Sequence, residues 1–410
     1  VTYGNEIDGK LFLGDVTYQD ETLAENWDVS VQLYTSYIHA DVTLDYYPHH
    51  FLYMIGNPIV TSKEIGVETA GVHQGWERHK IRLAAGSRYA EVDIDQYKNF
   101  TFISTPPFVR VGEMRHITDP DEIFMPDENR TIWHLSLQDE WTISPYWEFT
   151  AGVRFDEYSD FGSTTNPRLA LVWQTTDVLT SKLLYGRAFL APNFGQLYNK
   201  NNPVAIGNPG LGPQEIDTLE LAFDYRPLEN FRTALNLFTY TIDDIIEYTG
   251  APPQTAQNTG KQEGRGFEIE LNWRPRKDLT VYSNIAYQHA ENTRIDAEVH
   301  DAPQVQFYLN PHWNFLPGWS LDGQASWIGQ RPREPGDPRD GVDDYWLVNL
   351  TLRRQNLVKH WDVALAVRNL FDEDAGEPSP YDPGAPGGAW VPNDYPLQGR
   401  QFWAEVRVHF

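Results

Sequence analysis

The chain contains no cysteine, comparatively few basic residues and no long hydrophobic run, and each absence excludes a class of protein. With 0 Cys in 410 residues, disulfides and thiolate metal sites are excluded. Lys and Arg total 32 against 58 Asp and Glu, a net charge of -26, which argues against a general nucleic-acid-binding protein. No stretch reaches the roughly 18 to 20 apolar residues of a transmembrane helix, so a membrane-spanning chain would have to form a closed β-barrel.

Motifs of catalysis are missing as well. The sequence has no H-E-x-x-H, no G-x-S-x-G and no phosphate-binding G-x-x-x-x-G-K. Glu268 and Glu270 share one face of a predicted strand, a spacing that acid–base chemistry can use, but the polar wall of a barrel carries such pairs routinely. We therefore expect that the protein is not an enzyme.

Aromatic side chains that alternate with polar ones are abundant, with 14 Trp, 22 Tyr and 20 Phe. Side chains of a strand point alternately to its two faces, so this alternation predicts strands with one apolar and one polar face. Glu, Arg and Asp in the middle of a strand are too hydrated for a packed core and suit a water-filled lumen. In residues 400–410 the apolar face carries Phe402, Ala404, Val406, Val408 and Phe410, and the polar face carries Trp403, Glu405, Arg407 and His409.

The same pattern recurs along the chain and predicts seventeen strands, with little helical periodicity between them. They cover residues 9–18, 27–42, 63–74, 78–95, 130–142, 146–158, 166–175, 180–190, 215–226, 231–242, 264–274, 279–290, 303–314, 319–330, 344–355, 361–370 and 400–410. Counted back from Phe410, the connections alternate between long and short. Outer-membrane barrels have short periplasmic turns and long outside loops, whereas a soluble β-sandwich has no reason to keep that order.

These features predict an all-β protein, a large antiparallel transmembrane β-barrel in the outer membrane of a Gram-negative bacterium. Trp and Tyr at many strand ends are typical of the aromatic girdle at a membrane interface. Single-chain bacterial barrels have an even number of strands, so seventeen strands predict that the first strands of the barrel lie outside this chain. We expect residues 1–410 to be one barrel domain that is incomplete at its N-terminus.

Several motifs resemble those of TonB-dependent outer-membrane receptors. Residues 188–198 read A-F-L-A-P-N-F-G-Q-L-Y and residues 208–215 read N-P-G-L-G-P-Q-E, similar to the family's F-x-A-P…L-Y…N-P-x-L-x-P-E signature. Other matches are Q-D-E-W at 138–141, N-P-R-L at 166–169, N-x-G…G-x-G-F-E-I-E within 258–270, N-L-F-D at 369–372 and G-R at 399–400. The sequence departs from the pattern at Leu190, where a basic residue is common, at Gly212, where Lys is frequent, and at Gln214, which separates Pro213 from Glu215.

The resemblance implies a complete barrel of about 22 strands, with about five of them and a plug domain absent from this chain. It further implies TonB-dependent uptake of a scarce nutrient, most often a ferric siderophore, without a bound cofactor. The implied partners are a TonB-type energy-transducing complex that acts through the plug, a small-molecule metal chelate, and the lipopolysaccharide of the outer membrane, but no nucleic acid. The alternatives are a passive outer-membrane porin, a receptor for haem, cobalamin or a metal such as copper, and a soluble β-rich carbohydrate-active enzyme.

Candidate substrate-binding residues lie in the predicted outside loops. Loops 43–62 and 96–129 hold all 3 methionines together with several histidines. His with thioether ligands would suit copper, and His with Tyr would suit haem, whereas the simpler interpretation is that these side chains fill loops folded over the barrel. Aromatic and amide side chains in other loops suit an organic siderophore. The candidates are His49, His50, Tyr53, Met54, Met114, His116, Phe194, Tyr198, Asn201 and Trp390, with no metal specified.

Three further loop features carry structural predictions. Prolines and glycines in the 191–214 loop predict an ordered conformation, because they fix or permit particular turns. The charged run 332–344 is most simply solvated loop surface. We also expect loops 43–62 and 96–129 to face each other, with His49 near His116.

Overall fold

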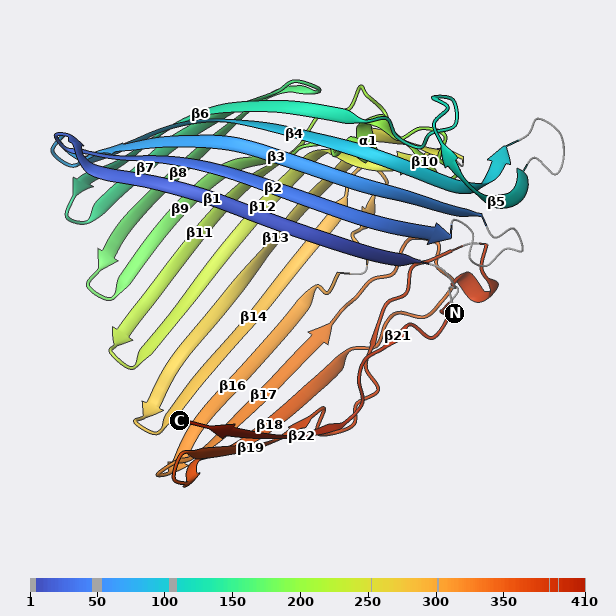
Figure 1. The fold of residues 1–410 in the computed structure, drawn as a ribbon. Coiled ribbons are helices and arrows are strands. Elements are labelled where there is room, and N and C mark those ends of the chain that lie inside the picture. Colours follow the sequence, from blue (N-terminus) through green and yellow to red (C-terminus); the bar gives the residue numbers. More distant parts are fainter. Residues whose placement is uncertain are drawn as a thin grey trace. The chain divides into compact units, whose positions relative to one another are not determined.

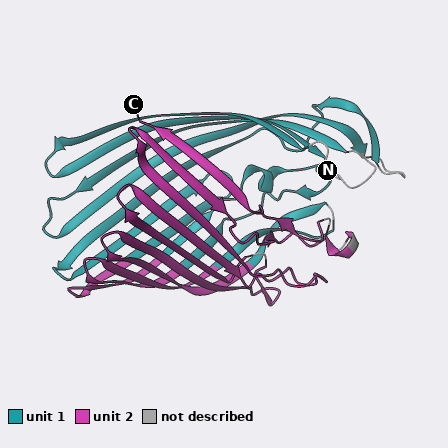
Figure 2. Cartoon of the chain, turned by 90° about the horizontal axis from the view of Figure 1, so that it is seen from below, with its two compact units in different colours: residues 1–169, 186–217, 242–260 teal, residues 170–185, 218–241, 261–410 magenta. Residues whose placement is uncertain are grey.

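Strands are the predominant secondary structure of the computed structural model, and the described residues otherwise contain one short α-helix and one 3₁₀-helix. The structure describes residues 5–45, 54–102, 109–251, 253–300, 302–382, 384–389 and 391–409. Within these ranges, no helix has the length and apolar character needed to cross a membrane. The chain divides into two compact units (Figure 2), the first comprising residues 1–169, 186–217 and 242–260 and the second residues 170–185, 218–241 and 261–410.

In the described part of the chain, twenty strands belong to one sheet, which is antiparallel apart from a short parallel pairing of β10 with β13, and β20 pairs with β21 separately. In chain order the elements are β1 (Glu6–Ala24), β2 (Trp27–Asp45), β3 (Ile55–His73), β4 (His79–Phe102), β5 (Val109–Ile117), β6 (Glu128–Ser144), β7 (Trp147–Tyr158), β8 (Gly162–Thr176), β9 (Leu179–Leu190), α1 (Phe194–Tyr198), β10 (Ala205–Ile206), β11 (Gln214–Leu228), β12 (Phe231–Thr249), β13 (Gln254–Arg276), β14 (Leu279–Asn292), β15 (Ala297–Glu298), β16 (Val305–Leu316), β17 (Trp319–Gly329), β18 (Tyr345–Val358), β19 (Trp361–Arg368), β20 (Gly376–Glu377), the 3₁₀-helix η1 (Pro386–Gly388), β21 (Tyr395–Pro396) and β22 (Gln401–Val408).

All seventeen predicted segments are strands, and the errors are misplaced strand ends and the unpredicted strands β5, β10, β15, β20 and β21. β3 begins at Ile55 instead of residue 63, and β13 begins at Gln254 instead of residue 264. β5 lies within the predicted loop 96–129. The start of β13 is polar on both faces, and the start of β3 places Ile59 and Val60 next to each other, so neither shows the alternation on which the prediction depends, while the backbone ladder continues without it.

In the first unit the long strands pair in chain order, β1 with β2, β2 with β3, β3 with β4, β4 with β6 and β6 with β7 (Figure 1). The register of these strand pairs places apolar side chains on one face of the sheet and polar side chains on the other. On one face Leu83 lies opposite Leu137, which lies opposite Val153. On the other face Glu68 lies opposite Gly86, which lies opposite His134.

The second unit contains a ladder with the same property, running β13, β14, β16, β17, β18, β19 and β22. One row across it reads Ile269, Ile285, Phe307, Trp327 and Trp346, and the next row along the strands reads Glu270, Asn284, Tyr308 and Ser326. The apolar face is open to its surroundings, as the 56% exposure of Leu365 and the 57% exposure of Val406 illustrate. An apolar surface of this extent needs a non-aqueous environment.

Candidate substrate-binding loops

In the first unit, a small hydrophobic cluster packs the C-terminal end of β4 against the 118–127 loop. Met54, Phe100 and Phe124 are buried together, with Val109 packed against them. Lys98 lies 5.6 Å and 5.5 Å from the ring centroids of Phe100 and Phe124 and donates to the Glu122 carbonyl at 2.9 Å. These contacts hold the 118–127 loop against β4.

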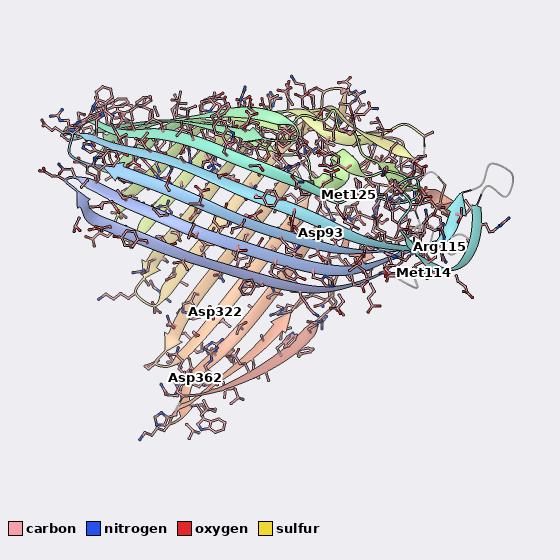
Figure 3. The ribbon with its side chains drawn as sticks, turned by 45° about the horizontal axis from the view of Figure 1, so that its top comes forward. Asp93, Met114, Arg115, Met125, Asp322 and Asp362 are labelled. Carbon is pink, nitrogen blue, oxygen red and sulfur yellow. The ribbon has the colours of Figure 1, made fainter. Side chains whose placement is uncertain are left out.

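The methionines and histidines of loops 43–62 and 96–129 have different environments. Met54 is 1% exposed inside the hydrophobic cluster, whereas Met114 on β5 is 46% exposed (Figure 3). His116 stacks on Tyr97 with ring centroids 4.9 Å apart, and its Nε2 lies 3.6 Å from Asp95 Oδ1. Met54 therefore fills a core, as the simpler interpretation of these loops predicts.

Four of the candidate residues, His49, His50, Tyr53 and Trp390, lie outside the described residues. The expected proximity of His49 to His116 therefore stays a prediction. Among the residues that the structure does describe, no three His, Cys, Asp or Glu side chains gather in a way that could hold a metal ion.

The signature loop, residues 191–214, is built around the five-residue helix α1. Asn193 caps this helix, because its side chain accepts from the Gln196 amide at 2.8 Å and the Gln196 side chain accepts from the Asn193 amide at 3.0 Å. Leu197 of the helix is buried with Leu211 and Ala256. A Cβ on Gly207 would lie 2.7 Å from the Leu197 carbonyl carbon, so only glycine fits there.

The asparagines of the family-like motifs fasten this loop to the start of β13. Asn208 donates to the Ala256 carbonyl at 3.2 Å. Asn258 accepts from the Gly212 amide at 2.8 Å and donates to the Gly212 carbonyl at 3.1 Å. The prediction that the signature residues order the loop is thus confirmed.

Arg130 on β6 is the centre of a buried cage beneath the signature loop. Its guanidinium lies 5.5 Å, 5.3 Å and 4.9 Å from the rings of Tyr158, Phe161 and Phe194. It forms an ion pair with Asp160 at 2.7 Å and donates to the Pro192 carbonyl at 2.9 Å. The side chains of Arg130 and Asp160 are 10% and 6% exposed.

The loop candidates Phe194, Tyr198 and Asn201 are half-buried and have structural partners. Phe194 covers Arg130 and stacks on Tyr198 with centroids 6.3 Å apart. Asn201 donates to the Ile123 carbonyl at 2.9 Å, which links the signature loop to the 118–127 loop. The structure brings these three together in one loop on the first unit.

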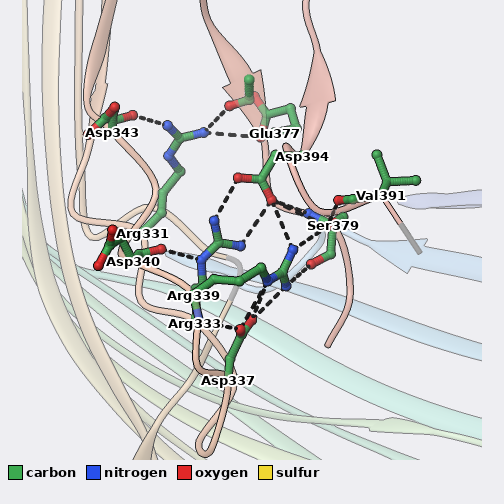
Figure 4. A network of polar contacts seen from close by, with 11 residues as sticks. Arg331, Arg333, Asp337, Arg339, Asp340, Asp343, Glu377, Ser379, Val391 and Asp394 are labelled. Carbon is green, nitrogen blue, oxygen red and sulfur yellow. Dashed lines mark hydrogen bonds and ion pairs between the residues drawn. The ribbon is translucent and has the colours of Figure 1, made fainter. Parts of the chain in front are cut away.

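A second ordered loop pair, in the second unit, went unpredicted. The 331–344 loop and the 376–394 segment are joined by an ion pair of Arg333 with Asp394 at 2.6 Å (Figure 4), and within the loop Arg339 pairs with Asp337 at 2.6 Å. Arg339 also reaches Asp394 at 3.4 Å and donates to the Ser379 carbonyl at 2.8 Å. The expectation of solvated surface at 332–344 holds for most of the run, but the side chains of Arg333 and Arg339 are each only 10% exposed because they pair with carboxylates.

Arg331 extends the same network. It donates to the carbonyls of Asp343 and Gly376, and its guanidinium lies 4.9 Å from the Tyr345 ring. The Tyr345 hydroxyl donates to Glu377 at 2.8 Å. The repeated Arg and Asp residues within 331–344 were the sequence feature that could have indicated an ion-pair network. Several of the partners lie far along the chain, so the pairing itself could not be predicted.

The polar face of the second unit carries a cavity of about 380 Å³. Its charged lining comes from neighbouring strands, with Arg232 2.7 Å from Asp224 and 3.4 Å from Glu270. Asn272 also donates to Glu270 at 2.9 Å. Glu270 is therefore engaged in ion pairing, as expected of a polar barrel wall.

The chain belongs to the family of TonB-dependent receptors, because the model of the TonB dependent receptor-like β-barrel matches residues 2–370. The antiparallel β-barrel fold and the outer-membrane location follow from this membership and confirm the prediction.

Three known proteins illustrate the similarity. A 143-residue stretch is 29% identical to the vitamin B12 transporter BtuB of Vibrio cholerae, covering 35% of this chain and 22% of that protein. The iron-regulated outer membrane virulence protein of Vibrio cholerae is 23% identical over 314 residues, 69% of this chain and 45% of its own length. The solved structure of the copper transporter OprC matches with a TM-score of 0.75 at 14% identity, over 98% of this chain and 66% of its own. The chain thus spans less than half the length of either sequence relative.

Proposed function

We propose that this chain is the barrel portion of a TonB-dependent outer-membrane transporter that takes up a ferric siderophore. The observation that supports transport is the separation of side chains across the sheet. Apolar rows such as Ile285, Phe307 and Trp327 occupy one face, and rows with Glu270 and Asn284 occupy the other. A wall of this kind offers a hydrated surface to a passing solute and an apolar surface to lipid.

Iron is favoured as the cargo metal by the relative that matches the larger share of this chain, since its name describes it as iron-regulated. An organic chelate is favoured by the loop chemistry. Phe194, Tyr198 and Asn201 offer aromatic and amide groups in an ordered loop. Met54 is enclosed by Phe100 and Phe124, which favours an organic chelate over a site built on its thioether.

In this proposal the barrel works by binding and guiding and catalyses no reaction. Outside loops bind the chelate, charged side chains of the polar face guide it, and the hydrogen-bonded wall stays rigid while a plug moves. The energy comes from an inner-membrane TonB-type complex that acts on the plug. Lipopolysaccharide surrounds the outside end of the barrel.

Growth of the producing organism with and without iron tests the cargo. We expect the protein to be strongly more abundant in isolated outer membranes after iron starvation, and uptake of a radio-iron siderophore to cease when the TonB partner is disrupted. Unchanged abundance under iron starvation would contradict iron as the cargo and direct the test to cobalamin or copper. Uptake that continues without the TonB partner would contradict coupled transport and favour a passive porin.

A further inference from the structure

An uninterrupted row of aromatic and cationic side chains runs across the second unit beside the short turns. Arg276 lies 5.7 Å from the Trp313 ring, Trp313 lies 5.5 Å from Phe315, Phe315 lies 6.2 Å from Trp319, and Arg354 lies 5.5 Å from the Trp319 ring. Two arginines therefore bracket three aromatic rings. We call these five residues the Arg–Trp row.

The strand register places this row on the apolar face. Trp313 lies opposite Leu279 and Leu321, and Trp319 lies opposite Arg354. Leu321 lies in turn opposite Leu352, which precedes Arg354 by two residues on β18 and shares its face. The row thus borders the surface that faces lipid, at the end of the strands where the connections are short.

The two arginines differ in their counter-ions. Arg276 donates to Asp278 at 3.1 Å, and the Trp313 indole donates to the same carboxylate oxygen at 3.0 Å. Arg354 donates to the Pro317 carbonyl at 2.6 Å and has no carboxylate partner in the part of the chain that the structure describes. A cation without a counter-ion on a lipid-facing surface, in a chain of net charge -26, is suited to an external anion.

The turn beside Arg354 is shaped to receive its side chain. Gly318 has φ 76°, a conformation that favours glycine, and a Cβ there would contact Arg354 Nη1. The guanidinium is consequently held between the turn carbonyl and the Trp319 ring. A guanidinium stacked on an aromatic face keeps edge N–H groups available for two-pronged contact with a phosphate.

We propose that the Arg–Trp row binds the phosphate of an anionic glycerophospholipid, with Arg354 as the main contact. Tryptophans at the membrane interface sit at the level of the head groups, where a phosphodiester would meet the guanidinium. Short turns of outer-membrane barrels face the periplasm, so the adjacent leaflet supplies phospholipid rather than lipopolysaccharide. The site would fix the depth of this part of the barrel in the membrane, a role separate from uptake of the chelate.

Arg353 provides a matched control, because it is adjacent in sequence but on the polar face. Its guanidinium pairs with Glu405 at 3.2 Å across the sheet. The full-length protein is purified in neutral detergent, dioleoylphosphatidylglycerol is added in steps, and native mass spectrometry counts the bound lipids. Arg354→Gln should weaken binding about fivefold, and Arg353→Gln should leave it unchanged.

Three outcomes would overturn the proposal. They are equal lipid binding by Arg354→Gln and the unaltered protein, equally tight binding of dioleoylphosphatidylcholine, and displacement of the lipid by inorganic phosphate at similar concentration. Arg354→Lys serves if the glutamine variant does not assemble. It should bind two- to threefold more weakly than the unaltered protein because a lysine lacks the planar fork, and binding equal to that of the unaltered protein would contradict the stacked geometry.

Discussion

At the residue scale, the most consequential side chain of the loop region is Arg130. Its guanidinium pairs with a buried carboxylate, donates to a backbone carbonyl and lies over three aromatic rings. Removing one partner of a buried ion pair leaves the other charge uncompensated, which costs about 3–5 kcal/mol. Arg130 of β6 therefore supports the start of the signature loop, in addition to the contacts within the loop and with β13.

We expect Arg130→Gln to loosen residues 191–214 and lower siderophore affinity, because Asp160 would stay buried without its cation. Limited proteolysis of the full-length protein in detergent measures the loosening, with cleavage mapped by mass spectrometry. Arg226→Gln is the control, since Arg226 is 64% exposed and such pairs contribute about 0–1 kcal/mol. Identical cleavage patterns for Arg130→Gln and the unaltered protein would contradict the role of the cage.

At the scale of elements, the 331–344 loop and the 376–394 segment behave as one connected piece. The Arg333 guanidinium lowers the pKa of Asp394 to about 2, and Arg339 lowers the pKa of Asp337. A carboxyl whose pKa is lowered in the folded state stabilises that state above its ordinary pKa, and the stabilisation is lost as the pH falls through the folded value. The connection should accordingly hold at pH 5 to 8 and weaken only from about pH 4 downwards.

Amide hydrogen exchange at residues 376–382 tests this, after correction for the intrinsic pH dependence. We expect constant protection between pH 5 and 8, and Asp394→Asn at pH 7 to accelerate exchange by about tenfold or more, because Arg333 and Arg339 both lose a carboxylate. Glu334 is an exposed residue of the 331–344 loop. In Glu334→Gln, residues 376–382 should therefore exchange at the same rate as in the unaltered protein. Protection that declines between pH 7 and 5 would be inconsistent with the lowered pKa values.

At the scale of the whole molecule, the decisive property is that the faces of the sheet differ in polarity. Leu350 and Thr351 are neighbours on β18 that point to opposite faces, with Leu350 opposite Gly323 and Val367 and Thr351 opposite Asp322 and Ala366. A lysine on the lipid face of a barrel costs about 2–4 kcal/mol near the middle of the membrane. On the polar face the same lysine meets water and an acidic neighbour.

Leu350→Lys should therefore reduce the amount of assembled protein in isolated outer membranes, and Thr351→Lys should leave it unchanged. Immunoblots of outer-membrane fractions at matched expression measure both. Equal amounts of the two variants would contradict the assignment of the apolar face to lipid.

The sequence by itself determined which segments are strands and which side chains share a face. The period of two belongs to the backbone of every strand, so Trp361, Val363, Leu365 and Val367 could be placed on one face without knowledge of their neighbours. The motifs of the signature loop likewise indicated an ordered turn. Strand ends without alternation, and β5, gave no such signal.

Only the tertiary structure decided how the loops are ordered. Arg130 meets Pro192 across 62 residues, and Arg333 meets Asp394 across 61. Met54 became a core residue because Phe100 and Phe124 close around it. Contacts between residues this far apart leave no periodic pattern in the sequence. A charged run also reads the same in the sequence whether water or distant loops surround it. Burial and pairing are set by which segments meet in space, so they were decided by the fold.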